Sequence, residues 1–127
     1  MGKWEFSPRS LREMKGIHPK LRKIADLALE YSEIDFIVTD GKRTLAEQRA
    51  YVRKGASKTM RSKHLTGRAL DFVSVVEGRI SWETRPMTSV ARAFKKASKE
   101  LGIPITWGGD WKGSWDKPHI QLGRNVK

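Results

Sequence analysis

"SKHLTGRALDF", residues 62–72, places a histidine, His64, seven residues before a carboxylate, Asp71. Asp71 stands between Leu70 and Phe72, in a run that otherwise has the apolar character of a buried strand. A buried charge without a partner is costly. We therefore expect Asp71 to have a partner, and either an arginine or a metal ion would serve.

The alternation of side chains along a strand indicates where that partner would lie. Successive strand residues point to opposite faces, so Asp71 shares a face with Gly67 and Ala69, which are small enough to leave room beside it. Near the C-terminus, His119 begins a second short strand pattern. If the two strands are neighbours, Asp71 and His119 converge, and His64 reaches the same point from the preceding loop. Two imidazoles and one carboxylate form the ligand set of a catalytic zinc site.

Capping and turn residues predict the other elements. Ser10 with Glu13 and Thr44 with Glu47 have the spacing of capping boxes, and Gly102 follows an amphipathic run as a helix stop. The predicted helices begin near residues 10, 19, 44 and 87, and the predicted strands cover 34–39, 68–76, 79–82, 103–107 and 119–122. This order predicts an α+β fold, with helices packed on a small, mostly antiparallel sheet. The length predicts one domain spanning residues 1–127.

Composition narrows the classes of partner and of metal site. There are 26 lysines and arginines against 14 acidic residues, for a net charge of +12. This charge favours anionic partners such as nucleic acid, anionic lipid or an acidic polymer, although a solvated basic surface is the alternative. There are no cysteines, which excludes disulfides and thiolate ligands. No apolar run is long enough to span a membrane, and the N-terminus lacks the apolar region of a secretory signal.

Three motifs together resemble a known enzyme family. They are Ser62-x-His64-x-x-Gly67-x-Ala69-x-Asp71, then Trp107-Gly108-Gly109-Asp110-Trp111, then Asp116-x-x-His119. This set resembles the D-Ala-D-Ala carboxypeptidase / L-alanyl-D-glutamate endopeptidase family of zinc peptidases, and within it the single-domain phage endolysins. The resemblance implies the α+β fold shared with the hedgehog signalling domain. It also implies one Zn²⁺ per chain, held by His64, Asp71 and His119.

The resemblance assigns two catalytic roles. Asp116 matches the family's catalytic carboxylate, and Arg43 in Gly41-Lys42-Arg43-Thr44 matches the arginine that stabilises the transition state. Asp116 lies three residues before His119, so it can reach the attacking water without being a ligand and can pass the proton to the leaving amine. Arg43 would brace the developing oxyanion with its planar donors. Taken alone, Asp116 could be a turn residue and Arg43 an ordinary surface arginine.

Four further residues are candidates for contact with substrate: Gln48, Ser62, Trp111 and Trp115. For Trp107, Trp111 and Trp115, core or rim packing is the favoured alternative, although Trp111 or Trp115 could line a groove. His18 precedes a proline and is interpreted as a helix N-terminal or packing residue.

The resemblance implies a peptidase that cleaves peptidoglycan stem peptides as a phage lysis enzyme. The expected partners are bacterial peptidoglycan and the anionic cell envelope, and a monomer is expected. Without a signal peptide, the protein would be made in the host cytoplasm and reach the wall after the inner membrane opens. The alternatives are a D-Ala-D-Ala carboxypeptidase of the same family and a basic nucleic-acid-binding protein, for which no sequence signature is found.

Overall fold

One antiparallel sheet organises the computed structural model, which describes residues 2–57, 60–113 and 116–127. The central strand is β2 (Ala69–Val76), which pairs with β1 (Asp35–Asp40) on one side and β5 (His119–Leu122) on the other. Strand β4 (Ile105–Trp107) extends the sheet beyond β5, and β3 (Arg79–Ser81) forms a hairpin with β2. Every strand pair among the described residues is antiparallel, which confirms the predicted sheet.

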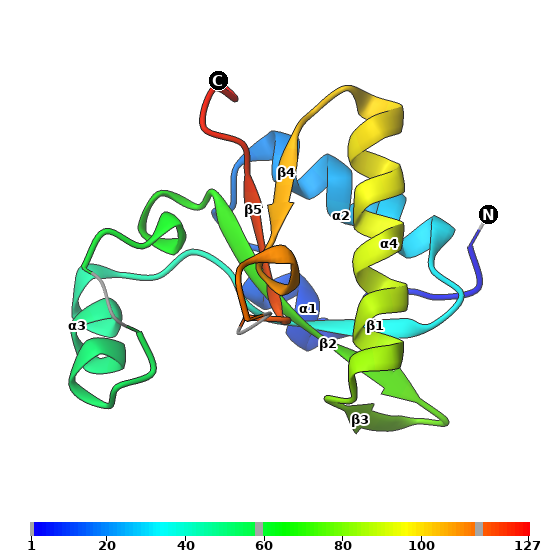
Figure 1. Cartoon of the computed structure of the whole chain (residues 1–127), viewed down its shortest axis with the longest axis horizontal. Helices are drawn as coiled ribbons and strands as arrows, with labels where there is room; N and C mark the ends of the chain where they lie inside the picture. The colour runs from blue at the N-terminus through cyan, green and yellow to red at the C-terminus, as the bar shows by residue number, and fades with distance from the viewer. Residues whose placement is uncertain (1, 58–59, 114–115) are drawn as a thin grey trace.

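Helices cover one face of this sheet and flank its end. The helices are α1 (Pro8–Glu13), α2 (Pro19–Tyr31), α3 (Leu45–Arg53) and α4 (Thr84–Leu101), with 3₁₀ turns η1 (Lys63–Thr66) and η2 (Gly108–Asp110). Helix α4 packs against α2 and β2, whereas α3 lies at the opposite end of the molecule (Figure 1). No helix in the described part of the chain has the length and apolar character needed to cross a membrane.

An aromatic cluster fixes the face of β2 that is buried. Phe72 stacks on Phe94 of α4 with ring centroids 5.6 Å apart, and Phe36 of β1 lies 5.3 Å from Phe94. All three rings are at most 1% exposed. Since neighbouring strand residues point to opposite faces, Asp71 lies on the face that α4 does not cover. The core of the fold and the candidate site therefore occupy opposite faces of the same strand.

Of the four predicted helix starts, those near residues 19 and 44 are confirmed, the one near residue 10 is wrong, and α4 begins at Thr84, three residues before the predicted position. Thr44 and Glu47 form the expected capping box of α3, and the His18 side chain caps α2 by accepting from the Lys20 backbone. Helix α1, however, is capped by Ser7, because Pro8 suits the first helical turn. Ser10 is instead buried, and its hydroxyl accepts from the backbone of β1. At the other end of the fold, Leu101, the last residue of α4, is 39% exposed.

Gly67 has a different role from the one predicted. It ends η1 with a φ of +71°, and a Cβ there would lie 2.6 Å from the carbonyl oxygen of Gly16. The Gly67 carbonyl also accepts from the backbone N–H of His18. Gly67 therefore lets the chain turn from η1 into β2 against the segment that precedes α2, rather than leaving room beside Asp71.

Gly67→Ala is expected to destabilise the fold more than Gly102→Ala. Both glycines have positive φ, which costs an L-residue roughly 1–2 kcal/mol. Only Gly67 also has a backbone atom within contact distance of the added methyl group, since nothing lies within 4 Å of the corresponding position at Gly102. Urea unfolding of both variants measures the difference. Equal losses would mean that the turn at Gly67 relaxes without cost.

Candidate active site

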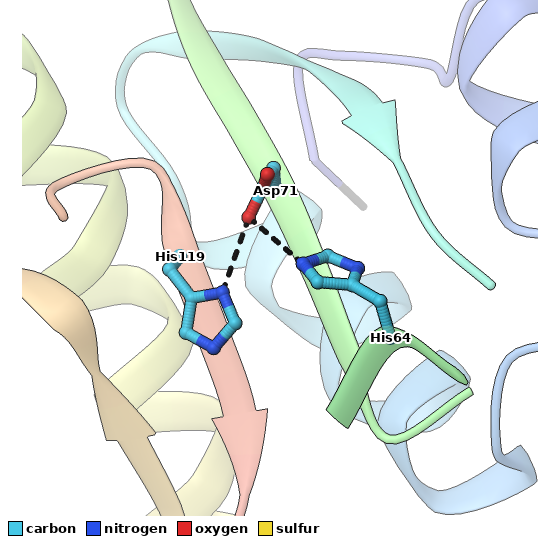
Figure 2. Close-up of side chains that lie close together, drawn as sticks. All are labelled: His64, Asp71 and His119. Carbon is cyan, nitrogen blue, oxygen red and sulfur yellow. Dashed lines mark hydrogen bonds and ion pairs between the residues drawn. The ribbon is translucent and has the colours of Figure 1, made fainter. Parts of the chain in front are cut away.

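Three side chains from separate elements meet on the face of the sheet that α4 does not cover. His64 comes from η1, Asp71 from β2 and His119 from β5, and Asp71 and His119 are partners in the strand register. One nitrogen of each ring and one carboxylate oxygen all lie within 4.8 Å of one another. Figure 2 shows both imidazoles directed at the same oxygen of Asp71. The predicted convergence of these three residues is therefore present in the structure.

The spacing of these atoms suits a shared metal ion. His64 Nε2 and His119 Nδ1 each lie 3.3 Å from Asp71 Oδ1. Charge-assisted N–H···O bonds are typically shorter, about 2.7–2.9 Å. Zinc ligands at about 2.0–2.1 Å in a tetrahedral arrangement lie roughly 3.3 Å from one another. The donor set therefore fits zinc, and the two distances to Asp71 Oδ1 match this spacing.

His64 presents an unpaired nitrogen to this centre. The ring is 2% exposed, and its Nδ1 lies 2.7 Å from the carbonyl oxygen of Gly41, which can only accept. In the neutral ring the proton is therefore on Nδ1, and Nε2 carries a lone pair. Nε2 is buried and has no hydrogen-bond partner among the described residues. A buried polar atom of this kind needs an explanation, and a metal ion supplies one.

Arg43 lies beside the metal-binding group and is held there by several contacts. Its Nη2 is 2.6 Å from Asp40 and 3.6 Å from Asp71, and its Nη1 donates to Gln48. Its guanidinium also lies over the ring of Tyr51, 4.1 Å from the centroid. Asp40 and Tyr51 were not among the predicted site residues. The spacing of Asp40 and Arg43 could have suggested a local ion pair, but nothing in the sequence indicated Tyr51.

Asp116 reaches the centre from the loop between η2 and β5. Its Oδ2 is 3.9 Å from His119 Nδ1, and its side chain is 29% exposed. The approach depends on Gly108, where an added Cβ would lie 2.1 Å from the Asp116 carbonyl oxygen. The Trp107-Gly108-Gly109 motif thus provides the space in which the Asp116 loop packs.

The two carboxylates differ in their affinity for a proton. Burial acts to raise the pKa of Asp71, but the His119 and His64 rings beside its Oδ1 outweigh this effect and hold that pKa well below its usual range. Burial raises the pKa of Asp116, and the charge of Asp71 adds to this effect. Burial acts to lower the pKa of His119, but Asp71, which would accept a hydrogen bond from the protonated ring, raises that pKa overall. Asp71 is thus suited to remain ionised as a ligand, whereas Asp116 is better suited to exchange a proton.

A cleft of about 460 Å³ opens over these groups. Its wall is formed by the site residues and by Gly55, Ala56, Ser57, Arg61, Ser62, Lys63, Trp111 and Gln121. Ser62 accepts from the His64 backbone, and the Trp111 ring lies 5.3 Å from that of His119. Gln48 is fully buried behind Arg43 and donates to Ser57, so the structure places it in support of the cleft wall. Trp115 lies outside the described residues.

Comparison with known proteins identifies the family. The model of the phage L-alanyl-D-glutamate peptidase family matches residues 2–124. The chain belongs to this family. It is 37% identical to the L-alanyl-D-glutamate peptidase of Escherichia phage T5, over 94% of this chain and 98% of that protein. It is also 37% identical to the L-alanyl-D-glutamate peptidase of Listeria phage A118, over 92% of this chain but only 42% of that longer protein.

A solved structure agrees with this membership of the phage L-alanyl-D-glutamate peptidase family. The L-Ala D-Glu endopeptidase ChiX of Serratia marcescens superposes with a TM-score of 0.87 at 45% sequence identity. The match covers 93% of this chain and 89% of ChiX. The predicted α+β fold and the resemblance to L-alanyl-D-glutamate endopeptidases are both confirmed.

Proposed function

We propose that this chain is a zinc peptidase that hydrolyses the bond between L-alanine and D-glutamate in peptidoglycan stem peptides. Residues 1–127 would act as one domain. The enzyme would be encoded by a phage genome and would lyse the bacterial host. The convergence of His64, Asp71 and His119 at one carboxylate oxygen, inside an open cleft, carries this proposal. Family membership supports the reaction class and the peptidoglycan substrate.

The mechanism assigns distinct work to the residues of the cleft. His64, Asp71 and His119 would hold zinc, which when bound polarises a scissile carbonyl and makes water more acidic. Asp116 accepts the proton of the attacking water and returns it to the leaving amine. Arg43 keeps its guanidinium beside the reacting carbonyl, where it stabilises developing negative charge. Its contacts to Asp40, Gln48 and Tyr51 fix its position before substrate arrives.

The products released from purified peptidoglycan test the reaction. Mass spectrometry should find fragments with a new amino-terminal D-glutamate and free carboxyl groups on L-alanine. Release of D-alanine alone would instead indicate a D-Ala-D-Ala carboxypeptidase. If no peptide bond were cut but nucleic acid were bound, the protein would belong to a different functional class.

Helix α4 supports attraction to an anionic envelope. Arg85, Arg92, Lys96 and Lys99 recur at helical spacing along its exposed side, and Lys95 lies beside them; these five residues are called the α4 basic stripe. Lys95 pairs with Asp110, and Lys96 lies over the ring of Tyr31. The stripe faces away from the cleft, because α4 covers the core face of β2. A polyanion bound there would leave the cleft open.

Hydrolysis of whole envelopes is therefore expected to fall steeply with added salt, whereas hydrolysis of a short soluble stem peptide should change little. Exposed charges are screened over about 8 Å at physiological ionic strength, but coordination and proton transfer inside the cleft are not. Arg92→Glu combined with Lys99→Glu should weaken envelope hydrolysis and spare the soluble peptide. Arg9→Glu with Arg12→Glu makes the same charge change on exposed positions of α1. Equal losses in both pairs would assign the attraction to net charge rather than to the α4 basic stripe.

A further inference from the structure

The side chain of Gln121 contacts the edge of the His119 ring that points away from Asp71. Gln121 lies two residues after His119 on β5, so both side chains are on the same face of the strand. Its Oε1 is 2.9 Å from His119 Nε2, whereas Nδ1 of the same ring points at Asp71. The two nitrogens of His119 therefore have separate partners.

With the Gln121 oxygen facing the ring, this contact sets where the ring proton of His119 lies. An amide oxygen only accepts, so Nε2 must donate to Gln121, which leaves a lone pair on Nδ1 of the neutral ring. His64 is arranged in the same way with its nitrogens exchanged, since Nδ1 donates to Gly41 and Nε2 is left with the lone pair. Both of these nitrogens lie beside Asp71 Oδ1, so the two lone pairs face the same point. A ring nitrogen can bind a metal ion only through such a lone pair.

The other tautomer of His119 would compete with metal binding. With its proton on Nδ1, His119 would donate a hydrogen bond to Asp71. Nδ1 would then have no lone pair for a metal ion, and the Asp71 oxygen would already be engaged. A glutamine amide could rotate and support this state by donating to Nε2. The two states therefore differ in which end of the Gln121 amide faces the ring.

We propose that Gln121 is a positioning residue whose side-chain oxygen fixes His119 in the tautomer that binds zinc. The inference rests on the zinc site of the proposed function. Gly41 has the equivalent role for His64, but it acts through a backbone carbonyl that substitution does not remove. Gln121 is therefore the support that can be tested by changing a side chain.

Three substitutions separate this role from simple packing. Gln121→Met keeps the length of the side chain but removes the acceptor, and it should weaken zinc binding about 10- to 100-fold, the usual cost of losing a supporting hydrogen bond to a metal ligand. Gln121→Glu offers only acceptors, so it should bind zinc at least as tightly as the unchanged protein. Thr106→Val is the matched control, because Thr106 is the register partner of Gln121 on β4 and makes no contact with His119 that the structure records.

The measurement is zinc affinity by competition with a chromophoric chelator, together with the ring-nitrogen spectrum of His119 by NMR. The zinc-loaded protein and its Gln121→Glu variant should show a proton on Nε2 that is protected from exchange, and the Gln121→Met variant should lose that protection. Unchanged zinc affinity in Gln121→Met, or equal weakening in Gln121→Glu, would overturn the proposal. Failure of the unchanged protein to bind zinc would overturn the metal site itself, and with it this role for Gln121.

Discussion

His119→Ala is expected to lose bound zinc and peptidase activity together. The substitution removes one of the three proposed zinc ligands, the ring whose Nδ1 lies 3.3 Å from Asp71 Oδ1. Loss of a ligand should exceed the roughly 10- to 100-fold effect of losing a support behind a ligand. Zinc content after dialysis and turnover on a soluble stem peptide measure both consequences in one preparation.

The fold itself is expected to survive this substitution. The neighbouring residues Ile120 and Leu122 are at most 1% exposed and hold β5 in the core, whereas His119 faces the cleft. Far-ultraviolet circular dichroism and thermal unfolding in the presence of chelator should therefore change little. This separates loss of the site from loss of the structure.

The third histidine provides a matched control. His18 caps α2 by accepting from the backbone of Lys20, and it is not part of the group that includes Asp71. His18→Ala should keep zinc and turnover, and it should cost roughly 1 kcal/mol of stability as a lost N-cap. Retention of zinc by His119→Ala would contradict the assignment of His119 as a ligand. Loss of zinc by His18→Ala would show that zinc content follows stability rather than ligation.

The sequence predicted the convergence of His64, Asp71 and His119 well, because strand alternation and local spacing determine it. Asp71 between two apolar residues, and His119 before Ile120, required only that the two strands pair, and they do so with Asp71 opposite His119. The capping box at Thr44 was similarly local, since both of its hydrogen bonds join residues three positions apart. Features of this kind depend on a few neighbouring residues.

The failures concern contacts between distant segments. Gly67 was expected to make room beside Asp71, but its backbone packs against Gly16, about fifty residues earlier in the chain. Nothing in the sequence indicated that Gln48, a candidate for substrate contact, is fully buried behind Arg43. The start of α1 was placed at Ser10, whose hydroxyl is used by β1 instead. In each case, contacts with distant segments decided the role of the residue, and local sequence patterns do not report such contacts.

Asp116→Asn is expected to keep zinc and the fold but lose most of the turnover. The amide is nearly the same size as the carboxylate, and Asp116 is not one of the three residues that form the metal-binding group. An amide cannot accept the proton of the attacking water. General-base catalysis typically contributes about 10²- to 10⁴-fold, so kcat should fall by at least about 10²-fold.

Asp110→Asn is the control for this substitution. Asp110 lies in the same loop region, but its carboxylate is paired with Lys95 at 2.6 Å and is about half exposed. It makes the same change of charge without removing a group from the cleft, so turnover should stay close to that of the unchanged protein. A large loss in Asp110→Asn with little loss in Asp116→Asn would reassign proton transfer to Asp110.

Zinc content then distinguishes a proton acceptor from a ligand at position 116. Asp116 Oδ2 is 3.9 Å from His119 Nδ1, farther than the 3.3 Å that separates each imidazole nitrogen from Asp71 Oδ1. If Asp116 is a general base, its replacement should change zinc affinity by no more than a few-fold, and only kcat should fall. If Asp116→Asn lost zinc as His119→Ala does, its carboxylate would have to be a fourth protein ligand. The position left for water in a catalytic zinc site would then be closed, and the proposed mechanism would fail at its first step.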